Sequence, residues 1–211
     1  MGLRDAIRKL LGTGAESAAT RDADPEDLFG MSTAYVTMEA DLGFEPAGEA
    51  ALCFGDVDST AFRDAVAEVR EILTVGESGT VADFRTDEYG YRWIVLEAAD
   101  FEELLTGVHF AADTLVDRRF GSRLQAAVFA FRPTDRAPGE GDRPVYWIYS
   151  FRRGAFYPFA PQGGTDRDSS VEFKLASVLD GELDVEDDRE YWYPLWPDDP
   201  GNHPGEGPRR G

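Results

Sequence analysis

The chain has few of the residues that build redox, metal or nucleophilic sites. Its 211 residues include one cysteine, Cys53, and two histidines, His109 and His203. A single cysteine excludes an intramolecular disulfide and fits a reducing compartment. Cys53 lies in an apolar run with no histidine nearby in the sequence, so we expect a buried, unreactive thiol. His109 falls within a helical pattern without an acid or cysteine placed to share a metal, which favours a packing role.

Catalytic and membrane-spanning signatures are also missing. The sequence has no glycine-rich phosphate loop and no HExxH, CxxC or Gly-x-Ser-x-Gly motif. It has no run of about 18 apolar residues that would predict a membrane-spanning helix, and its charged N-terminus is not typical of a secretory signal. We therefore expect a cytoplasmic protein without catalytic residues, a metal site or a cofactor.

Lysine is scarce and acidic residues are in excess. Lys9 and Lys174 are the only lysines, and 41 acidic residues against 21 basic ones give a formal net charge of −20. Such a surface repels nucleic-acid phosphates, so we expect no nucleic-acid partner. It also suits a halophilic protein that stays soluble in molar salt, where self-repulsion is screened. A GC-rich genome, which favours arginine, alanine, glycine and aspartate, is the alternative explanation.

The N-terminal segment is the exception to this acidity. In Gly2–Leu11 an apolar stripe lies beside basic residues, a pattern typical of a short amphipathic helix. The stripe consists of Leu3, Ile7, Leu10 and Leu11, and the basic residues are Arg4, Arg8 and Lys9. Such a helix docks on a membrane surface or on a partner, or else folds back on its own domain. A flexible tether completes residues 1–23, and we expect one domain over residues 24–197 and a disordered tail over residues 198–211.

Strand and helix patterns follow one another along the middle of the chain. Asp24 is expected to cap a short helix, and strands are predicted at residues 35–42, 49–54, 81–86, 91–97 and 124–131. Longer helices are predicted at residues 62–73, 100–118 and 169–179. Strand pairs followed by helices predict an α+β fold, in which an antiparallel sheet is built from repeated hairpins and the helices pack mainly on one face.

The segment Val145–Pro161, VYWIYSFRRGAFYPFAP, is the densest aromatic stretch. Arg152, Arg153 and Gly154 predict a hairpin turn, and Pro158 predicts that the returning arm is an edge strand. Both sides of the first arm are apolar, whereas a strand with one wet face alternates apolar and polar residues. Either the hairpin is covered on both faces, with the aromatic run 191–197 as the candidate cover, or one face needs a partner.

These alternatives give the hairpin two possible roles. In the first it is a partner-binding surface whose arginines bind partner carboxylates, and its residues are Tyr149, Arg152, Arg153, Phe156 and Tyr157. In the second, one arginine closes a salt bridge within the chain and the other is solvated. The acidic run 184–188 lacks the glycine and the terminal glutamate of a calcium loop, so we interpret it as a solvated face.

Several segments together resemble the PspA-associated protein PspAB family: LFGMSTAYVTMEADLGFEPAGEAALCF (28–54), YGYRWIVLE (89–97), FGSRL (120–124), the aromatic hairpin and YWYPLWP (191–197). The resemblance runs over residues 24–197, and RRGAFYPFAP is its most specific part. It implies association with phage-shock protein A (PspA), a peripheral protein that assembles on stressed cytoplasmic membranes. It also implies a link to an HtpX-like membrane metalloprotease. The family brings no catalytic residues to this sequence.

Two classes of function follow. We expect a non-enzymatic adaptor that acts by protein–protein interaction in the membrane stress response, with membrane contact that is peripheral if it occurs. The alternative is a small-ligand sensor or an enzyme with a pocket beside the hairpin 145–161.

Overall fold

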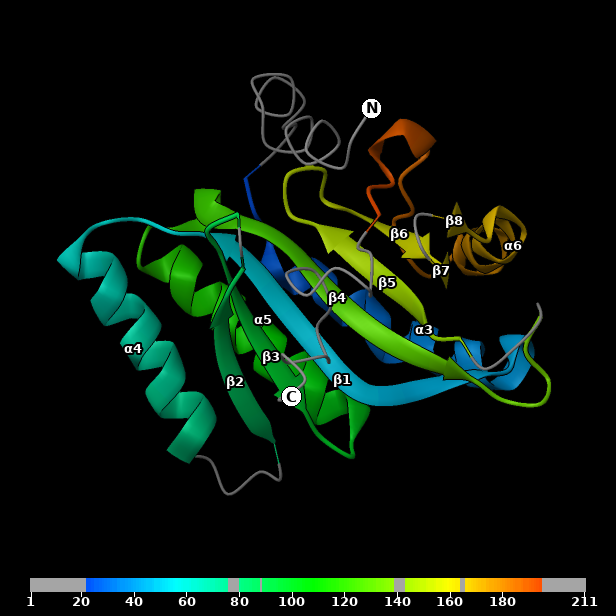
Figure 1. Cartoon of the computed structure of the whole chain (residues 1–211), viewed down its shortest axis with the longest axis horizontal. Helices are drawn as coiled ribbons and strands as arrows, with labels where there is room; N and C mark the ends of the chain where they lie inside the picture. The colour runs from blue at the N-terminus through cyan, green and yellow to red at the C-terminus, as the bar shows by residue number, and fades with distance from the viewer. Residues whose placement is uncertain (1–21, 76–79, 88, 139–142, 164–165, 195–211) are drawn as a thin grey trace.

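The computed structural model describes residues 22–75, 80–87, 89–138, 143–163 and 166–194. Its main feature is a six-stranded sheet with the order β2-β3-β1-β4-β5-β6, in which every neighbouring pair is antiparallel (Figure 1). The strands are β1 (Phe44–Gly55), β2 (Val81–Thr86), β3 (Tyr91–Glu97), β4 (Leu124–Pro133), β5 (Val145–Ser150) and β6 (Ala155–Phe159). A separate short pair, β7 (Pro161–Gly163) and β8 (Asp166–Arg167), follows β6. The predicted α+β class is confirmed.

Most helices pack on one face of the sheet, which we call the first face (Figure 1). They are the 3₁₀ helix η1 (Pro25–Gly30), α3 (Met31–Thr37), the π-helical turn η2 (Met38–Leu42), α4 (Thr60–Val75), α5 (Phe101–Asp117) and, beside β6, α6 (Ser169–Leu179). Two short 3₁₀ turns, η3 (Gly121–Arg123) and η4 (Arg189–Tyr191), complete the described elements. The first-face core contains fully buried side chains from sheet and helices alike, such as Phe129, Trp147, Phe62 and Leu105.

Capping side chains mark the starts of three helices, η1, α4 and α5. The carboxylates of Asp24 and Asp100 accept hydrogen bonds from the backbone N–H groups of Glu26 and Glu102, at 3.1 and 2.8 Å. The Ser59 hydroxyl likewise accepts from the Phe62 N–H at 3.1 Å. Each bond satisfies one of the backbone donors left free in the first turn of a helix.

His109 has the packing role that its helical position predicts. Its ring lies 4.5 Å from the Phe29 ring, centroid to centroid, and its Nε2 lies 2.9 Å from Glu26 Oε1. These contacts join α5 to η1, so the histidine helps to place the first described residues of the chain over the middle of α5.

The prediction of a strand at residues 35–42 is wrong, because this segment is helical. Met31, Ala34, Met38 and Leu42 recur at helical spacing and are all buried against the first face. Tyr35, Val36 and Thr37, which lie between them, favour strands, so the local sequence predicted a strand. Packing against the sheet outweighs this local preference and stabilises a helix. The first hairpin is consequently absent, and β1 is instead one strand of 12 residues with a register shift between Pro46 and Ala50.

Gly43 makes the sharp exit from this helix into β1 possible. Its φ of 74° lies in the left-handed region, and a Cβ there would lie 2.6 Å from the carbonyl carbon of Arg136. Its carbonyl oxygen accepts hydrogen bonds from both the N–H and the hydroxyl of Thr134. Only glycine fits this turn without strain.

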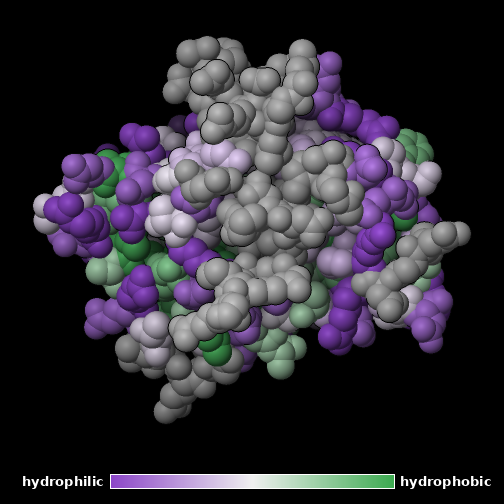
Figure 2. Space-filling view, in the orientation of Figure 1, coloured by the Kyte–Doolittle hydropathy of each residue, from purple (hydrophilic) through white to green (hydrophobic). Residues whose placement is uncertain are grey.

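The opposite face of the sheet, the second face, is also apolar. Its buried cluster is Ala51, Cys53, Trp93, Val95, Val128, Ala130, Tyr146, Ile148, Tyr157, Phe159 and Trp192. In Figure 1 α5 lies behind β1 and β3, away from this face, and α4 lies at the side of the sheet beyond β2. Figure 2 shows the same view in space-filling form, in which hydrophilic residues predominate at the margins of the described surface. Trp192 belongs to the C-terminal segment, residues 183–194, which therefore contributes to the second core.

Candidate functional site: the aromatic hairpin and the C-terminal segment

The aromatic hairpin forms the β6 end of the sheet and contributes side chains to both cores. Trp147, Tyr149 and Phe156 face the first core, whereas Tyr157 and Phe159 face the second. All five are at most 4% exposed. Two of the buried polar groups on the first face have partners, since the Tyr149 hydroxyl donates to Asp27 Oδ2 at 2.6 Å and the Trp147 N–H to the Met38 sulfur at 3.4 Å. The hairpin is thus covered on both faces within the monomer.

Three of the five predicted partner-binding residues are buried, and the other two are half-buried. Tyr149, Phe156 and Tyr157 lie in the core and offer no exposed aromatic patch. Arg152 and Arg153 are half-buried at the turn, where Gly154 has the expected positive φ of 64°. The two arginines are adjacent in this turn. A partner that binds the hairpin would therefore have to contact the turn.

Arg153 makes a two-point ion pair with Glu186. Its Nε and Nη2 donate to Glu186 Oε2 and Oε1 at 2.6 and 3.0 Å, and the carboxylate is almost fully buried. The hydrogen bond to Glu186 raises the pKa of Arg153 above its ordinary value. The guanidinium also lies 4.0 Å from the centroid of the Tyr191 ring. Glu186, which we expected within a solvated acidic face, instead anchors the C-terminal segment to the hairpin turn.

The C-terminal segment also closes the open edge of the sheet. Val185 forms a parallel bridge with Phe156; the Phe156 N–H donates to the Asp184 carbonyl at 2.7 Å, and the Glu186 N–H to the Phe156 carbonyl at 2.8 Å. Pro158 has no N–H to offer, which agrees with the predicted edge position of β6. These bonds satisfy backbone groups that an edge strand otherwise exposes.

Trp192 covers the second face of the hairpin, as we expected of the aromatic run 191–197. Its side chain is 6% exposed, and its indole N–H donates to the Glu186 carbonyl at 2.8 Å. Residues 195–197 lie outside the described part of the chain, so that part of the expectation is not tested.

A second buried ion pair joins α6 to the end of the hairpin. The Glu172 side chain is 1% exposed; it accepts the Ala160 N–H at 3.0 Å and Arg167 Nε at 2.8 Å. Arg167 Nη1 in turn donates to the Trp192 carbonyl at 2.9 Å. Burial raises the pKa of Glu172, and the hydrogen bonds from Arg167 and Ala160 oppose that shift. Sequence reasoning missed this pair, because nothing local distinguishes Glu172 from other helical acids.

Burial also governs the chemistry of the single cysteine. Burial, and secondarily the charge of Asp87, raise the pKa of Cys53 well above its ordinary value. The neutral thiol is therefore the stable form, and thiolate is the form that reacts. The expectation of a buried cysteine is confirmed.

We predict that Cys53 reacts with a thiol reagent such as DTNB at least about tenfold more slowly in the folded protein than in the unfolded chain, since each unit of pKa costs about tenfold in thiolate. Absorbance at pH 8 measures both rates. Ser122→Cys adds a thiol at an exposed position and should react at the rate of the unfolded chain. Equal native rates for the two thiols would contradict the burial of Cys53.

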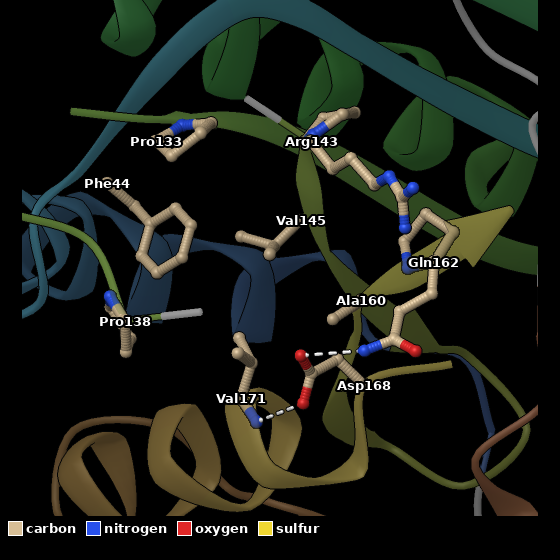
Figure 3. Close-up of a pocket in the computed structure, with 11 residues that line it drawn as sticks. Phe44, Pro133, Pro138, Arg143, Val145, Ala160, Gln162, Asp168 and Val171 are labelled. Atoms are coloured by element: carbon tan, nitrogen blue, oxygen red, sulfur yellow. Dashed lines mark hydrogen bonds between the residues drawn. The ribbon is translucent and has the colours of Figure 1, made fainter. Parts of the chain in front are cut away.

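One pocket lies beside the hairpin, between β5, β7 and α6 (Figure 3). Its walls include Phe44, Val145 and Val171, and Asp168 accepts hydrogen bonds at its edge from Gln162 and from the Val171 N–H. The cavity volume is about 40 Å³. Sites for small molecules are usually about 300–1,000 Å³, so this pocket has room for a few water molecules and for little else.

The described residues include no group of three or more histidine, cysteine or acidic side chains that could hold a metal ion. Within the same ranges, no helix has both the length and the apolar character needed to cross a bilayer. The predicted docking residues of Gly2–Leu11 lie outside the described residues, and their role stays a prediction.

The fold and the hairpin define an α+β protein whose antiparallel sheet is closed at one edge by its own C-terminal segment. Residues 1–205 match the family model PspAB, PspA associated protein B, and the chain belongs to that family. The match extends beyond the segments that carry the resemblance in the sequence. No curated protein and no solved structure matches the chain.

Proposed function

We propose that this protein is a non-enzymatic adaptor that binds a PspA-like membrane-remodelling protein during cell-envelope stress. Membership of the PspA-associated family is the observation that carries this proposal. An HtpX-like protease as a second partner, and peripheral contact of residues 2–11 with the membrane, belong to the same proposal.

The turn of the aromatic hairpin is the surface that we assign to the partner. Arg152 is half-buried, and no ion pair with it occurs among the described residues, whereas Arg153 is held by Glu186. A planar guanidinium on a rigid turn suits a partner carboxylate, which the acidic remainder of the surface repels. The buried aromatic residues support this turn from below and do not touch the partner.

The alternative, an enzyme or ligand sensor with its site beside the hairpin, receives no support from the small cavity there. Its volume admits neither a substrate nor a cofactor of ordinary size. The adaptor is the function that we propose, because family membership supports it.

Arg152→Ala should weaken binding to a PspA-like protein by about tenfold or more, since an interface hot spot contributes about 2 kcal/mol. The expected change in thermal stability is small, within about 0.5 kcal/mol, because Arg152 lies at the surface. Binding is measured by calorimetry or by surface plasmon resonance with both purified proteins.

Arg63→Ala is the matched control, because Arg63 is also an exposed arginine but lies on α4, far along the sheet from the turn. It should bind with the affinity of the unmodified chain. Unchanged affinity of Arg152→Ala would remove the turn from the interface, and no binding by the unmodified chain would contradict the proposed function itself.

A further inference from the structure

A second surface feature is an apolar groove between the end of α4 and the first half of α5. Its volume is about 480 Å³, and its floor includes Ile72, Leu73 and Phe110. Ile72 is 46% exposed, and Leu73 and Phe110 are half-buried. A groove of this volume with an apolar floor can take the apolar face of an amphipathic helix.

The depth of the groove depends on Gly107. A Cβ at this position would lie 2.7 Å from Leu96 Cδ1 and 3.7 Å from Leu73 Cδ2, so a larger residue here would require the Leu96 side chain to shift. The rim is acidic, with the exposed carboxylates of Asp100, Glu102 and Glu103 at one end. An occupant should therefore have an apolar stripe and basic flanks.

We propose that the occupant is the N-terminal segment of this same chain, Gly2–Leu11. Its apolar stripe matches the floor, and Arg4, Arg8 and Lys9 match the acidic rim. With three basic residues and one acidic residue, it is a cationic stretch in a chain of net charge −20. A short amphipathic helix that is marginal in water gains stability by packing its apolar face in a groove.

The length of the N-terminal segment agrees with the length of the groove. The stripe from Leu3 to Leu11 spans about 12 Å as a helix, and the length of α5 from Asp100 to Phe110 is about 15 Å. The described residues begin at Asp22, and four residues later Glu26 contacts His109 on α5, which lies about 9 Å along the helix axis from Glu103. Residues 12–21 can extend over about 33 Å, which is ample for this separation.

Occupation of the groove has a regulatory consequence. While the segment lies in the groove, its apolar stripe and its basic residues are unavailable to a membrane or to another protein. The inference concerns the isolated chain and does not depend on the proposed binding of PspA.

The scarcity of lysine gives a direct experiment on the full-length chain. A water-soluble carbodiimide joins a lysine amine to a neighbouring carboxylate without a spacer, and Lys9 and Lys174 are the only lysines. Peptide mass spectrometry should find Lys9 joined mainly to Asp100, Glu102 or Glu103. A mixture of isotope-labelled and unlabelled chains distinguishes links within one chain from links between two.

Ile72→Ser removes an apolar side chain from the floor and should lower the yield of these Lys9 links about five- to tenfold. Val36→Ser is the matched control, because Val36 is similarly exposed, at 50%, but lies on α3 outside the groove; the yield should not change. Lys9 links spread over carboxylates elsewhere, links that form only between chains, or a yield insensitive to Ile72→Ser would each overturn the inference.

Discussion

Replacing Trp192 with alanine should lower the free energy of unfolding by about 3–5 kcal/mol, the usual cost of deleting a buried tryptophan. The side chain is 6% exposed and belongs to the apolar cluster of the second face. Its removal also leaves the Glu186 carbonyl without the indole N–H. Because total stabilities are about 5–15 kcal/mol, this single change should remove at least about a fifth of the stability of the protein. Urea denaturation followed by circular dichroism measures the loss.

Two further variants separate the loss of buried apolar area from the loss of the hydrogen bond. Trp192→Phe keeps most of the apolar surface and loses the hydrogen bond, so it should cost about 1 kcal/mol beyond the smaller buried area. Phe173→Ala deletes an aromatic side chain that is 62% exposed and should change stability by no more than about 0.5 kcal/mol. If Trp192→Ala is as mild as Phe173→Ala, the C-terminal segment is not part of the core.

Glu172→Ala should cost about 3 kcal/mol. Removing one partner of a buried ion pair typically costs about 3–5 kcal/mol, and the partial exposure of Arg167, at 25%, places the effect at the lower end. The substitution also leaves the buried Ala160 N–H without its acceptor. The measurement is again urea denaturation, at neutral pH.

The paired variant Glu172→Leu with Arg167→Met tests whether the loss comes from an uncompensated charge. Replacing a buried ion pair by apolar residues is often neutral, so the pair should recover the part of the loss that comes from the uncompensated charge, while the Ala160 N–H stays without its acceptor. Equal losses in the single and the paired variants would show that the contribution comes from packing and not from charge.

Glu172 should also make the free energy of unfolding depend on pH. Burial raises the pKa of Glu172 in the folded state, so the folded protein holds this proton more tightly than the unfolded chain. The stabilisation from this group is present in full below the unfolded pKa and is lost as pH rises through the folded pKa. Glu172→Gln cannot titrate, so its stability should lack this component as the pH rises above the ordinary glutamate pKa of about 4.3.

The elements with local signals could be predicted from the sequence. Asp24 and Asp100 mark helix starts through their caps, and Gly154 marks the hairpin turn. The two-sided apolar pattern of β5 indicates that both faces need cover, but it leaves open whether the chain itself or a partner provides it. The helix at residues 31–42 was missed because its four buried positions pack on distant strands, and its middle residues favour a strand.

The contacts at the hairpin turn were less predictable. The sequence allowed that one arginine closes a salt bridge, but the acidic run 184–188 contains four candidate acids. The selection of Glu186 depends on the bridge between Val185 and Phe156, which is a contact of tertiary structure. The alternation of apolar and acidic residues from Leu183 to Glu186 is the one local signal of an added strand.

The closure of β6 by a later part of the chain has a consequence during synthesis. Residues 184–186 are made about 30 residues after Phe156, which at ribosomal speeds of about 5–20 residues per second corresponds to about 2–6 s. Throughout that time the outer edge of β6 has no partner from its own polypeptide, and an apolar edge of this kind pairs readily with another nascent chain. Slow translation of the last part of the message would lengthen this interval and favour aggregation on polysomes.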